Sequence, residues 1–538
     1  MTMRAGFDYV VIGAGAAGCV VAGRLAAAGA RVVVIEAGGS DRNPLIGIPG
    51  ANVVTGTDPS LNWSYQTQPV ASLGQRSLYW AQGRVLGGSG SINGMMYLRG
   101  QPEDFDAWSA MGATGWHWDA VLPAFRRSET NERGASDLHG GDGPLHVSKG
   151  VATAPVCDLL LEAAGAAGLP VTDDLNRPAA ESFGHVDQTL HRGRRSGPAG
   201  AWLHPQRRAG RLMVLTHTRA LRLIVEHQRV VGVLCRGPEG DQEIRAEAEV
   251  ILSAGAVNSP ALLLQSGIGP ARDLRALGLE VVLDLPGVGG NLQNHPCYKI
   301  MYTTSAPVTA YAHVRPLGAL KAGLDYVLHR AGPLARGLFP TAGLFRVGPQ
   351  DHQAMQVCMA PALVIRRRPG ILGILPQRHG FTLLLNQGIP RSVGQVTLAS
   401  ADPLAAPRIQ PGYFGDPADT TDLIEGIRRL QALMREAPLA GVIEAQIQPA
   451  GAPRTDGELA ADIAASATTH FHPVGTCRMG LGNDAVVTPD LRLRGLDGLR
   501  IADASVMPRI VNGNTFAATL MIGERAAEFI LGARATHA

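Results

Sequence analysis

The sequence predicts an α/β fold, and three observations near its start support this prediction. Residues 9–12 form a short apolar run typical of a buried parallel strand, and it leads directly into Gly13-x-Gly15-x-x-Gly18. An Ala-rich stretch with helical character follows as far as Gly29. A second apolar run, residues 32–35, ends at Glu36, so the opening of the chain reads as strand, helix and strand.

Each glycine of the first motif has a physical role. Gly13 permits the tight turn, Gly15 lets backbone amides approach a pyrophosphate, and Gly18 lets the helix lie close to the strand. Glu36 follows the last glycine by 18 residues, where it can accept hydrogen bonds from ribose hydroxyls. The motif therefore predicts a dinucleotide site, although a merely structural turn is the alternative. It does not distinguish FAD from NAD.

A second glycine-rich segment, "GRVLGGSGSING" at residues 83–94, is too rich in glycine for a helix or a strand interior. Gly87, Gly88 and Gly90, with Ser89 and Ser91 between and beside them, suit a loop whose backbone amides point at an anion or a ring edge. The alternative is a flexible surface loop.

Later segments extend the same pattern. Residues 250–253 predict a strand, followed by a helix capped by Asn258 or Ser259 with Pro260 in its first turn. Residues 212–234 alternate as in a hairpin, which predicts an antiparallel layer.

The C-terminal end returns to strand and helix. The segment 499–508 reads as a strand ending at Asp503, and an apolar helix starts near Asn514. A nucleotide-binding domain is therefore expected to use both ends of the chain. Between them, residues 419–436 predict an amphipathic helix whose apolar face packs in the core.

Composition limits the classes of function. The chain has 538 residues, a formal net charge of +3 and no basic block, so a small molecule is a better expected partner than a nucleic acid. Its six cysteines lie far apart without a C-x-x-C pair, which favours reduced thiols over disulfides or zinc. No apolar run approaches the roughly 18 residues of a membrane span. With a strand beginning by about residue 8 and no leader before it, the expected location is the cytoplasm.

The segment "ATTHFHPVGTCRMG", residues 467–480, concentrates reactive side chains. A metal site made by His470, His472 and Cys477 would need a ligand spacing and a fourth partner that are not evident. A cysteine nucleophile with a histidine base has no supporting local signature. We therefore expect no metal.

Taken together, these segments resemble the glucose–methanol–choline (GMC) oxidoreductases, which are FAD-dependent enzymes that oxidise alcohols. The resemblance covers essentially the whole chain and includes "VIGAGAAG", "GRVLGGSGSINGMMYLRG", "GAVNSPALLLQSGIG", "PGVGGNLQNHP", "HFHPVGTCRMG" and "RIADASVMPRIVNGNTFAATLMIGERAA". It implies a flavin domain of the p-hydroxybenzoate hydroxylase type and a substrate domain with a mainly antiparallel sheet covered by helices. The expected boundaries are 1–155, 205–300 and 466–538 for the discontinuous FAD domain, and 156–204 and 301–465 for the substrate domain.

The resemblance also implies the roles of site residues. His472 corresponds to the family's histidine that faces the flavin and acts on the substrate hydroxyl, and Asn514 corresponds to its companion. An alcohol donates hydride only as its O–H proton leaves, so a base must touch that oxygen. The residues expected to bind FAD are Gly13, Gly15, Ala16, Ala17, Gly18, Glu36, Ala37, Arg84, Gly87, Gly88, Ser89, Asn93, Gly94, Met95, Ala220, Ala254, Asp503, Ala504, Asn514 and Thr515.

Four departures from the family pattern shape the expectations. Ile92 stands where some members carry a histidine bonded to the flavin, so the FAD should be non-covalent. Asn294 replaces an aspartate of the family's "NLQDH". Thr341 falls where choline-handling members have a glutamate, and Phe471 where they usually have tyrosine. A neutral primary alcohol is therefore expected rather than a cation.

Other questions remain open at this point. The electron acceptor is O2 or a soluble or quinone compound. A hydroxynitrile lyase, a photodecarboxylase and a non-catalytic flavoprotein are the alternative functions. Residues 314–333 and 364–373 are candidates for lids or for the contact face of a homo-oligomer.

Overall fold

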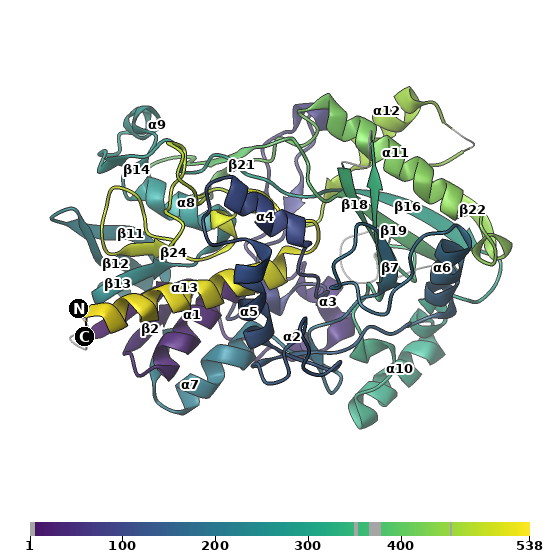
Figure 1. The fold of residues 1–538 in the computed structure, drawn as a ribbon, viewed down its shortest axis with the longest axis horizontal. Coiled ribbons are helices and arrows are strands. Elements are labelled where there is room, and N and C mark those ends of the chain that lie inside the picture. Colours follow the sequence, from purple (N-terminus) through teal and green to yellow (C-terminus); the bar gives the residue numbers. More distant parts are fainter. Residues whose placement is uncertain (1–5, 349–352, 365–377, 452–453, 538) are drawn as a thin grey trace.

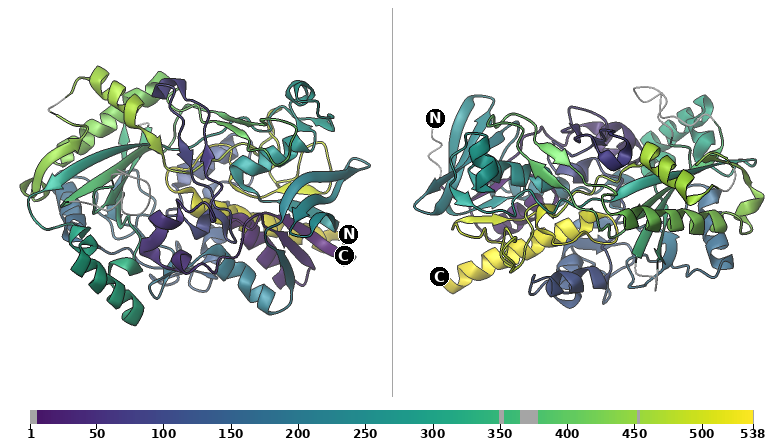
Figure 2. Two further views of the ribbon diagram at one scale, coloured as in Figure 1. Left: turned by 180° about the vertical axis from the view of Figure 1, so that it is seen from behind. Right: turned by 90° about the horizontal axis from the view of Figure 1, so that it is seen from above.

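The computed structural model describes residues 6–348, 353–364, 378–451 and 454–537, and its two large sheets have seven strands each (Figure 1). Figure 2 shows from two further sides that both chain ends lie at the same end of the molecule, beside the first sheet. The predicted α/β class is therefore confirmed.

The first sheet combines a parallel part with an antiparallel extension. Its order is β10 (Leu212–Leu215), β2 (Val32–Ile35), β1 (Phe7–Ile12), β13 (Gly240–Leu252), β12 (Arg229–Gly237) and β11 (Arg219–Glu226), with β24 (Leu499–Ile501) paired to β13. β10, β2, β1, β13 and β24 pair in parallel, and the residues of β1 and β2 are almost all buried because helices cover these strands. Two of these helices, α1 (Ala16–Ala27) and α13 (Thr515–His537), lie against each other (Figure 1).

The expected hairpin over residues 212–234 is only partly right. β11 and β12 form the antiparallel pair, but β10 runs parallel to β2, with Leu212 opposite Val32. β10 lies at the edge of the sheet, with Leu212 buried and Met213 exposed, and the bend at 216–218 separates it from the alternating segment.

The helix after β13 begins earlier than expected. α8 (Gly255–Gln265) starts three residues before Asn258, so Pro260 lies inside the helix rather than in its first turn. Pro260 has no N–H to donate to the carbonyl of Ala256. The hydroxyl of Thr476 donates to that carbonyl instead (2.7 Å), which explains how the proline is tolerated.

The second sheet is antiparallel throughout, as the resemblance implies. Its order is β22 (Ile443–Gln448), β16 (Pro296–Thr304), β19 (Gly380–Gln387), β18 (Gln353–Ala360), β17 (Thr341–Val347) and β7 (Ser182–His185), with β23 (Thr468–Thr469) on β16. α11 (Pro417–Leu433) packs its predicted apolar face on β17 and β19. The domain boundaries stay a prediction, and β16 crosses the expected boundary at residue 300.

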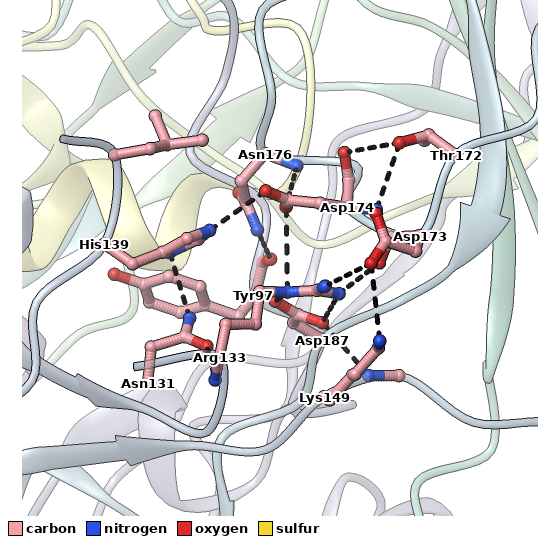
Figure 3. A network of polar contacts seen from close by, with 12 residues as sticks. Tyr97, Asn131, Arg133, His139, Lys149, Thr172, Asp173, Asp174, Asn176 and Asp187 are labelled. Carbon is pink, nitrogen blue, oxygen red and sulfur yellow. Dashed lines mark hydrogen bonds and ion pairs between the residues drawn. The ribbon is translucent and has the colours of Figure 1, made fainter. Parts of the chain in front are cut away.

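A buried polar network joins the 129–150 segment to the 172–187 segment (Figure 3). The ring of His139 lies between two carboxylates, with Nδ1 2.9 Å from Glu129 and Nε2 3.0 Å from Asp174. Burial disfavours the charged ring, but these two bonds outweigh it and raise the pKa of His139. Arg133 and Asp187 continue the network with an ion pair of 2.9 Å. Because the buried charges of the network are paired, they can stay buried.

Within the described ranges, no helix is both long and apolar enough to cross a membrane.

Candidate active site

A cavity of about 680 Å³ lies between the two sheets. On one side it is lined by residues at or just beyond the carboxyl ends of parallel strands, among them Ile12, Ile35 and Ser253. On the other side Cys297, Cys358 and Leu384, from neighbouring strands of the second sheet, form its wall. The carboxyl ends of parallel strands are the usual place for a ligand in such sheets.

The first glycine motif shapes one end of this cavity. Gly13 has a φ of +99°, and a Cβ there would lie 2.4 Å from the carbonyl oxygen of Ser253. A Cβ on Gly88 would lie 2.8 Å from Cα of Gly15, so the second glycine loop touches the first. Only glycine allows the two loops to approach this closely, and together they leave their backbone on the cavity wall.

Glu36 lies at the same end and is nearly buried. Its carboxylate accepts from the backbone N–H groups of Ala14 (3.0 Å) and Gly38 (2.8 Å). Burial raises its pKa to about 7, despite these two donors. Hydroxyl donors of a ligand would stabilise the ionised form, as the ribose prediction requires.

Most of the residues expected to bind the cofactor line the cavity. They are Gly13, Gly15, Ala16, Ala17, Glu36, Ala37, Gly88, Ser89, Asn93, Gly94, Met95, Ala220, Ala254, Asp503, Ala504, Asn514 and Thr515. Gly18, Arg84 and Gly87 do not line it. Gly18 has the packing role predicted for it, because a Cβ there would lie 2.1 Å from the carbonyl oxygen of Gly13. Gly87 turns the loop with a φ of +88°, and Arg84 lies over the ring of Trp63.

Asp503 has a structural task in addition to lining the cavity. Its carboxylate accepts from the backbone N–H of Gly255 (2.9 Å) and from the hydroxyl of Ser259 (2.6 Å). It therefore holds the N-terminal end of α8, where a negative charge is favourable.

Sequence reasoning missed part of the cavity wall, including Thr218 and Arg219. These residues follow the carboxyl end of β10, which is a parallel strand. Reading residues 212–215 as a parallel strand would have placed them at the cofactor end of the sheet.

At the centre of the cavity wall, His472 contacts Asn514. The amide nitrogen Nδ2 of Asn514 lies 3.1 Å from Nε2 of His472, and its Oδ1 accepts from Nε2 of Gln356 (3.2 Å). Because Gln356 donates to Oδ1, Nδ2 of Asn514 is the donor toward His472. The structure thus brings together the two residues that the sequence places 42 positions apart, with Nε2 of His472 as an acceptor.

The other ring nitrogen of His472 contacts His295, which sequence reasoning did not single out. The two Nδ1 atoms lie 2.9 Å apart, and Nε2 of His295 lies 2.9 Å from the carbonyl oxygen of Gly388. A carbonyl only accepts, so Nε2 of His295 carries hydrogen and its Nδ1, in the neutral ring, is bare. Nδ1 of His472 must then donate, which leaves Nε2 of His472 without a proton.

All three histidines of this cluster favour the neutral form. Burial, then the neighbouring His295 and His470, hold the pKa of His472 well below its usual value. Burial lowers the pKa of His295 to about 4 and that of His470 to about 3. The ring of His470 lines the cavity, and its Nε2 has no partner among the described residues.

The turn at Phe471 is strained and sets the orientation of the rings of His470 and His472. Phe471, between the two histidines, has a φ of +64°, which is uncommon for a non-glycine residue. Its N–H donates to Oγ1 of Thr469 (3.0 Å), which is itself fixed by Asn294 (2.9 Å) and Tyr413 (3.0 Å). Oδ1 of Asn294 also accepts from the backbone of His472 (2.8 Å). The side-chain amide of Asn294 therefore stabilises the turn through hydrogen bonds and does not line the cavity.

The substrate end of the cavity is mainly apolar. Besides the two cysteines and Leu384, it is lined by residues such as Met96, Leu338 and Phe339. Lys299 joins this wall two residues beyond Cys297 on β16, and its ammonium donates to the carbonyl of Val364 (3.4 Å). Thr341 is buried away from the cavity and contacts the ring of His185. Position 341 therefore contributes no group to this wall.

Metal ligands do not gather at the site. Within the described part of the chain, no cluster of His, Cys, Asp or Glu residues suits a metal ion. Cys477, which follows the histidines in the sequence, is fully buried in the apolar core of the first sheet.

This fold and this cavity define a dinucleotide-binding oxidoreductase with two sheets around one site. The chain belongs to the GMC oxidoreductase family, since the models of the family's N- and C-terminal parts match residues 7–297 and 390–523. The resemblance seen in the sequence is therefore confirmed.

Relatives extend over nearly the whole chain. Mitochondrial choline dehydrogenase of Homo sapiens is 39% identical over 538 residues, which cover 98% of this chain and 90% of the relative. Alcohol dehydrogenase [acceptor] of Pseudomonas putida is 38% identical, covering 98% and 96%. Among solved structures, pyridoxine 4-oxidase from Mesorbium loti has a TM-score of 0.87 at 31% identity, covering 97% of this chain and 99% of its own. The protein is thus an FAD-dependent oxidoreductase that acts on the CH–OH group of alcohols.

Proposed function

We propose that this enzyme oxidises a neutral primary alcohol to the aldehyde, with His472 as the general base and Asn514 as the group that positions the hydroxyl. The observation that carries the proposal is the bare Nε2 of His472, which lies 3.1 Å from Nδ2 of Asn514 on the cavity wall. A ring nitrogen without hydrogen can accept a proton. The alcohol would replace the contact between the two side chains, with its hydroxyl donating to Nε2 of His472 and its oxygen accepting from Nδ2 of Asn514.

The neighbours of His472 favour this role before and after proton transfer. Its lowered pKa keeps the ring neutral at working pH, so the base is ready to accept. Once Nε2 has taken the alcohol proton, the Nδ1–H bond to His295 becomes a bond from a cation, and such bonds are stronger than neutral ones. His295 thereby orients the ring through both steps, while it also contributes to the low pKa of His472.

The cofactor end of the cavity fits FAD. The two glycine loops offer backbone amides to the pyrophosphate, and Glu36 offers a carboxylate to the ribose. Nε2 of His470, which has no partner among the residues that the structure describes, offers a further polar contact to the bound ligands. Bound FAD supplies the oxidant that accepts the hydride from the alcohol carbon.

The FAD is proposed to be non-covalent. Ile92 is a buried aliphatic side chain on the cavity wall and has no atom that can bond to a flavin ring. Precipitation with acid should therefore leave the yellow colour in the supernatant. Yellow colour that stays in the pellet would contradict this expectation.

The substrate is proposed to be neutral because Lys299 is the one charged residue that lines the apolar end within the described parts of the chain. Its ammonium has no carboxylate partner within the described residues, so it would repel a quaternary ammonium. The relatives named above include a choline dehydrogenase and an alcohol dehydrogenase, and the lysine favours the second kind of substrate.

The electron acceptor is proposed to be O2 or a soluble or quinone compound. The names of relatives point both ways, since one from Brucella suis is an oxygen-dependent choline dehydrogenase and the Pseudomonas putida enzyme is named for an acceptor. Mixing the reduced enzyme with air-saturated buffer in a stopped-flow instrument separates the two. Reoxidation much slower than turnover with an artificial acceptor rules out an oxidase.

Anaerobic mixing of the wild-type holoenzyme with a panel of alcohols tests the reaction itself. Neutral primary alcohols should bleach the flavin absorbance. If no alcohol bleaches it, the oxidation proposal is wrong, and a lyase or a non-catalytic flavoprotein on the same fold takes its place.

A further inference from the structure

Helix α10 (Pro316–His329) turns its apolar side chains toward solvent. They are exposed to between 52% (Leu324) and 84% (Leu317), and the set comprises Leu317, Leu320, Leu324, Val327 and Leu328. Their spacing of three and four residues places them on one stripe of the helix. The packed side carries Ala322 and Tyr326. Single exposed leucines are ordinary, but a continuous stripe of them marks a surface that something covers.

The helix projects from the edge of the molecule beside the cavity. In Figure 1 and in the left view of Figure 2, α10 extends away from the second sheet. The hydroxyl of Tyr326 donates to the carbonyl of Gly47 (3.3 Å), which ties the helix to residues 44–57. Asn52, Val53 and Val54 of that segment line the cavity. Although distant in the sequence, α10 therefore packs on a segment that also forms part of the cavity wall.

Positively charged residues lie on α10 and next to its two ends. Arg315 precedes the helix, Lys321 lies along it and Arg330 follows it, whereas Asp325 is the one carboxylate of residues 315–330. Two further arginines flank its C-terminal end, because Gly193 packs against the carbonyl of Arg330 and the guanidinium of Arg194 lies over Gly47. The cations around the stripe are Arg192, Arg194, Arg315, Lys321 and Arg330. Among the described residues none of them forms an ion pair.

We propose that α10 docks this enzyme on an anionic lipid bilayer. The helix lies flat at the surface, with its leucines in the acyl boundary and the surrounding cations on the headgroup phosphates. With 14 residues it is too short to span a bilayer, which takes about 20. The apolar stripe complements the acyl region of the bilayer, and the cations next to it complement the anionic headgroups above that region.

A second copy of the chain fits this surface less well. In a two-fold dimer the same surface meets itself, so the five cations would face one another. A protein partner also fits less well, because the stripe contains only Leu and Val, whereas the centres of protein interfaces are enriched in aromatic residues and arginine.

Vesicle sedimentation tests the proposal. We expect the wild-type holoenzyme to sediment with vesicles of phosphatidylcholine and phosphatidylglycerol, more weakly with phosphatidylcholine alone, and less at high salt. The triple variant Leu317→Ser, Leu324→Ser, Leu328→Ser should lose sedimentation while keeping its flavin and its activity on a water-soluble alcohol. Lys321→Glu with Arg330→Glu should weaken it. As a matched control, Leu481→Ser changes a leucine that is 66% exposed elsewhere, and it should sediment as the wild type does.

Three outcomes would overturn the proposal. One is a wild-type enzyme that sediments with neither kind of vesicle. The second is a dimer, seen by light scattering, that the triple variant converts to monomer without any vesicle binding by the wild type, because the occupant is then a second copy. The third is equal sedimentation of the wild type and the triple variant.

Discussion

The cofactor end and the substrate end of the cavity are built from different parts of the chain. At the cofactor end, the cavity wall is formed mainly by backbone turns, as at Gly13, where a Cβ would collide with Ser253. At the substrate end, side chains from separate strands meet, as when Gln356 of β18 orients Asn514 at the start of α13. Short local sequence motifs specify backbone turns, whereas the topology of the fold decides which side chains from distant segments come into contact. The two ends should therefore respond differently to substitution.

The largest effect is expected at His472. His472→Ala should leave the protein folded and yellow but slow flavin reduction by on the order of 10²-fold or more, the usual scale for a lost general base. Asn514→Ala is the matched comparison and should cost less, because the pocket shares the task of positioning. Single-turnover reduction measures both. A rate in His472→Ala equal to that of the wild type would show that another group is the base.

His295 should have the next largest effect, through the ring that it orients. His295→Leu leaves Nδ1–H of His472 buried without an acceptor and should slow flavin reduction about tenfold. His295→Gln is the control, since its carbonyl can accept from His472 and its amide can donate to Gly388. Equal losses in both variants would mean that His295 serves packing alone.

The pH dependence of flavin reduction distinguishes an electrostatic role of His295 from a role in packing alone. The rate of flavin reduction requires neutral His472, and a pKa well below the usual value places any acid limb well below pH 6.5. The wild-type rate should therefore be flat across neutral pH. His295→Leu removes one of the two neighbouring histidines that lower the pKa of His472, so any acid limb should move upward in this variant. An acid limb near pH 7 in the wild type would contradict the neutral cluster.

At the cofactor end, Glu36 should make FAD affinity depend on pH. In the free site its pKa is raised to about 7, and ribose hydroxyls that donate to the carboxylate lower that pKa on binding. Binding then releases protons, so affinity should be several-fold higher at pH 8 than at pH 6. Titration of apoprotein with FAD measures this. Glu36→Gln should abolish the dependence, and a variant that keeps it would place its origin elsewhere.

The smallest effect is expected at Lys299. Lys299→Met keeps the length of the side chain but removes the charge that faces the apolar end. The ratio of kcat/KM for choline to that for its neutral isostere, 3,3-dimethylbutan-1-ol, should rise a few-fold. A wild-type enzyme that already prefers choline would show that the lysine does not set specificity.

The two ends also differ in how far the sequence predicts them. The βαβ unit, the second glycine loop and the pairing of His472 with Asn514 follow from motifs, and each lies on the cavity wall. The contacts of His295 do not, because its partners at 388 and 472 are brought together only by the second sheet and its loops. The early start of α8 was missed for a similar reason, since Thr476 is distant in the chain and replaces the donor that Pro260 lacks.

The central claim is that the neutral ring of His472 carries its proton on Nδ1 and offers a bare Nε2 to the alcohol. Nitrogen NMR on holoenzyme with isotope-labelled histidine tests it directly, with the signals of His472 identified by their loss in His472→Gln. We predict a protonated Nδ1, a bare Nε2 and no titration across neutral pH. A proton on Nε2, or a doubly protonated ring at pH 7, would contradict the account.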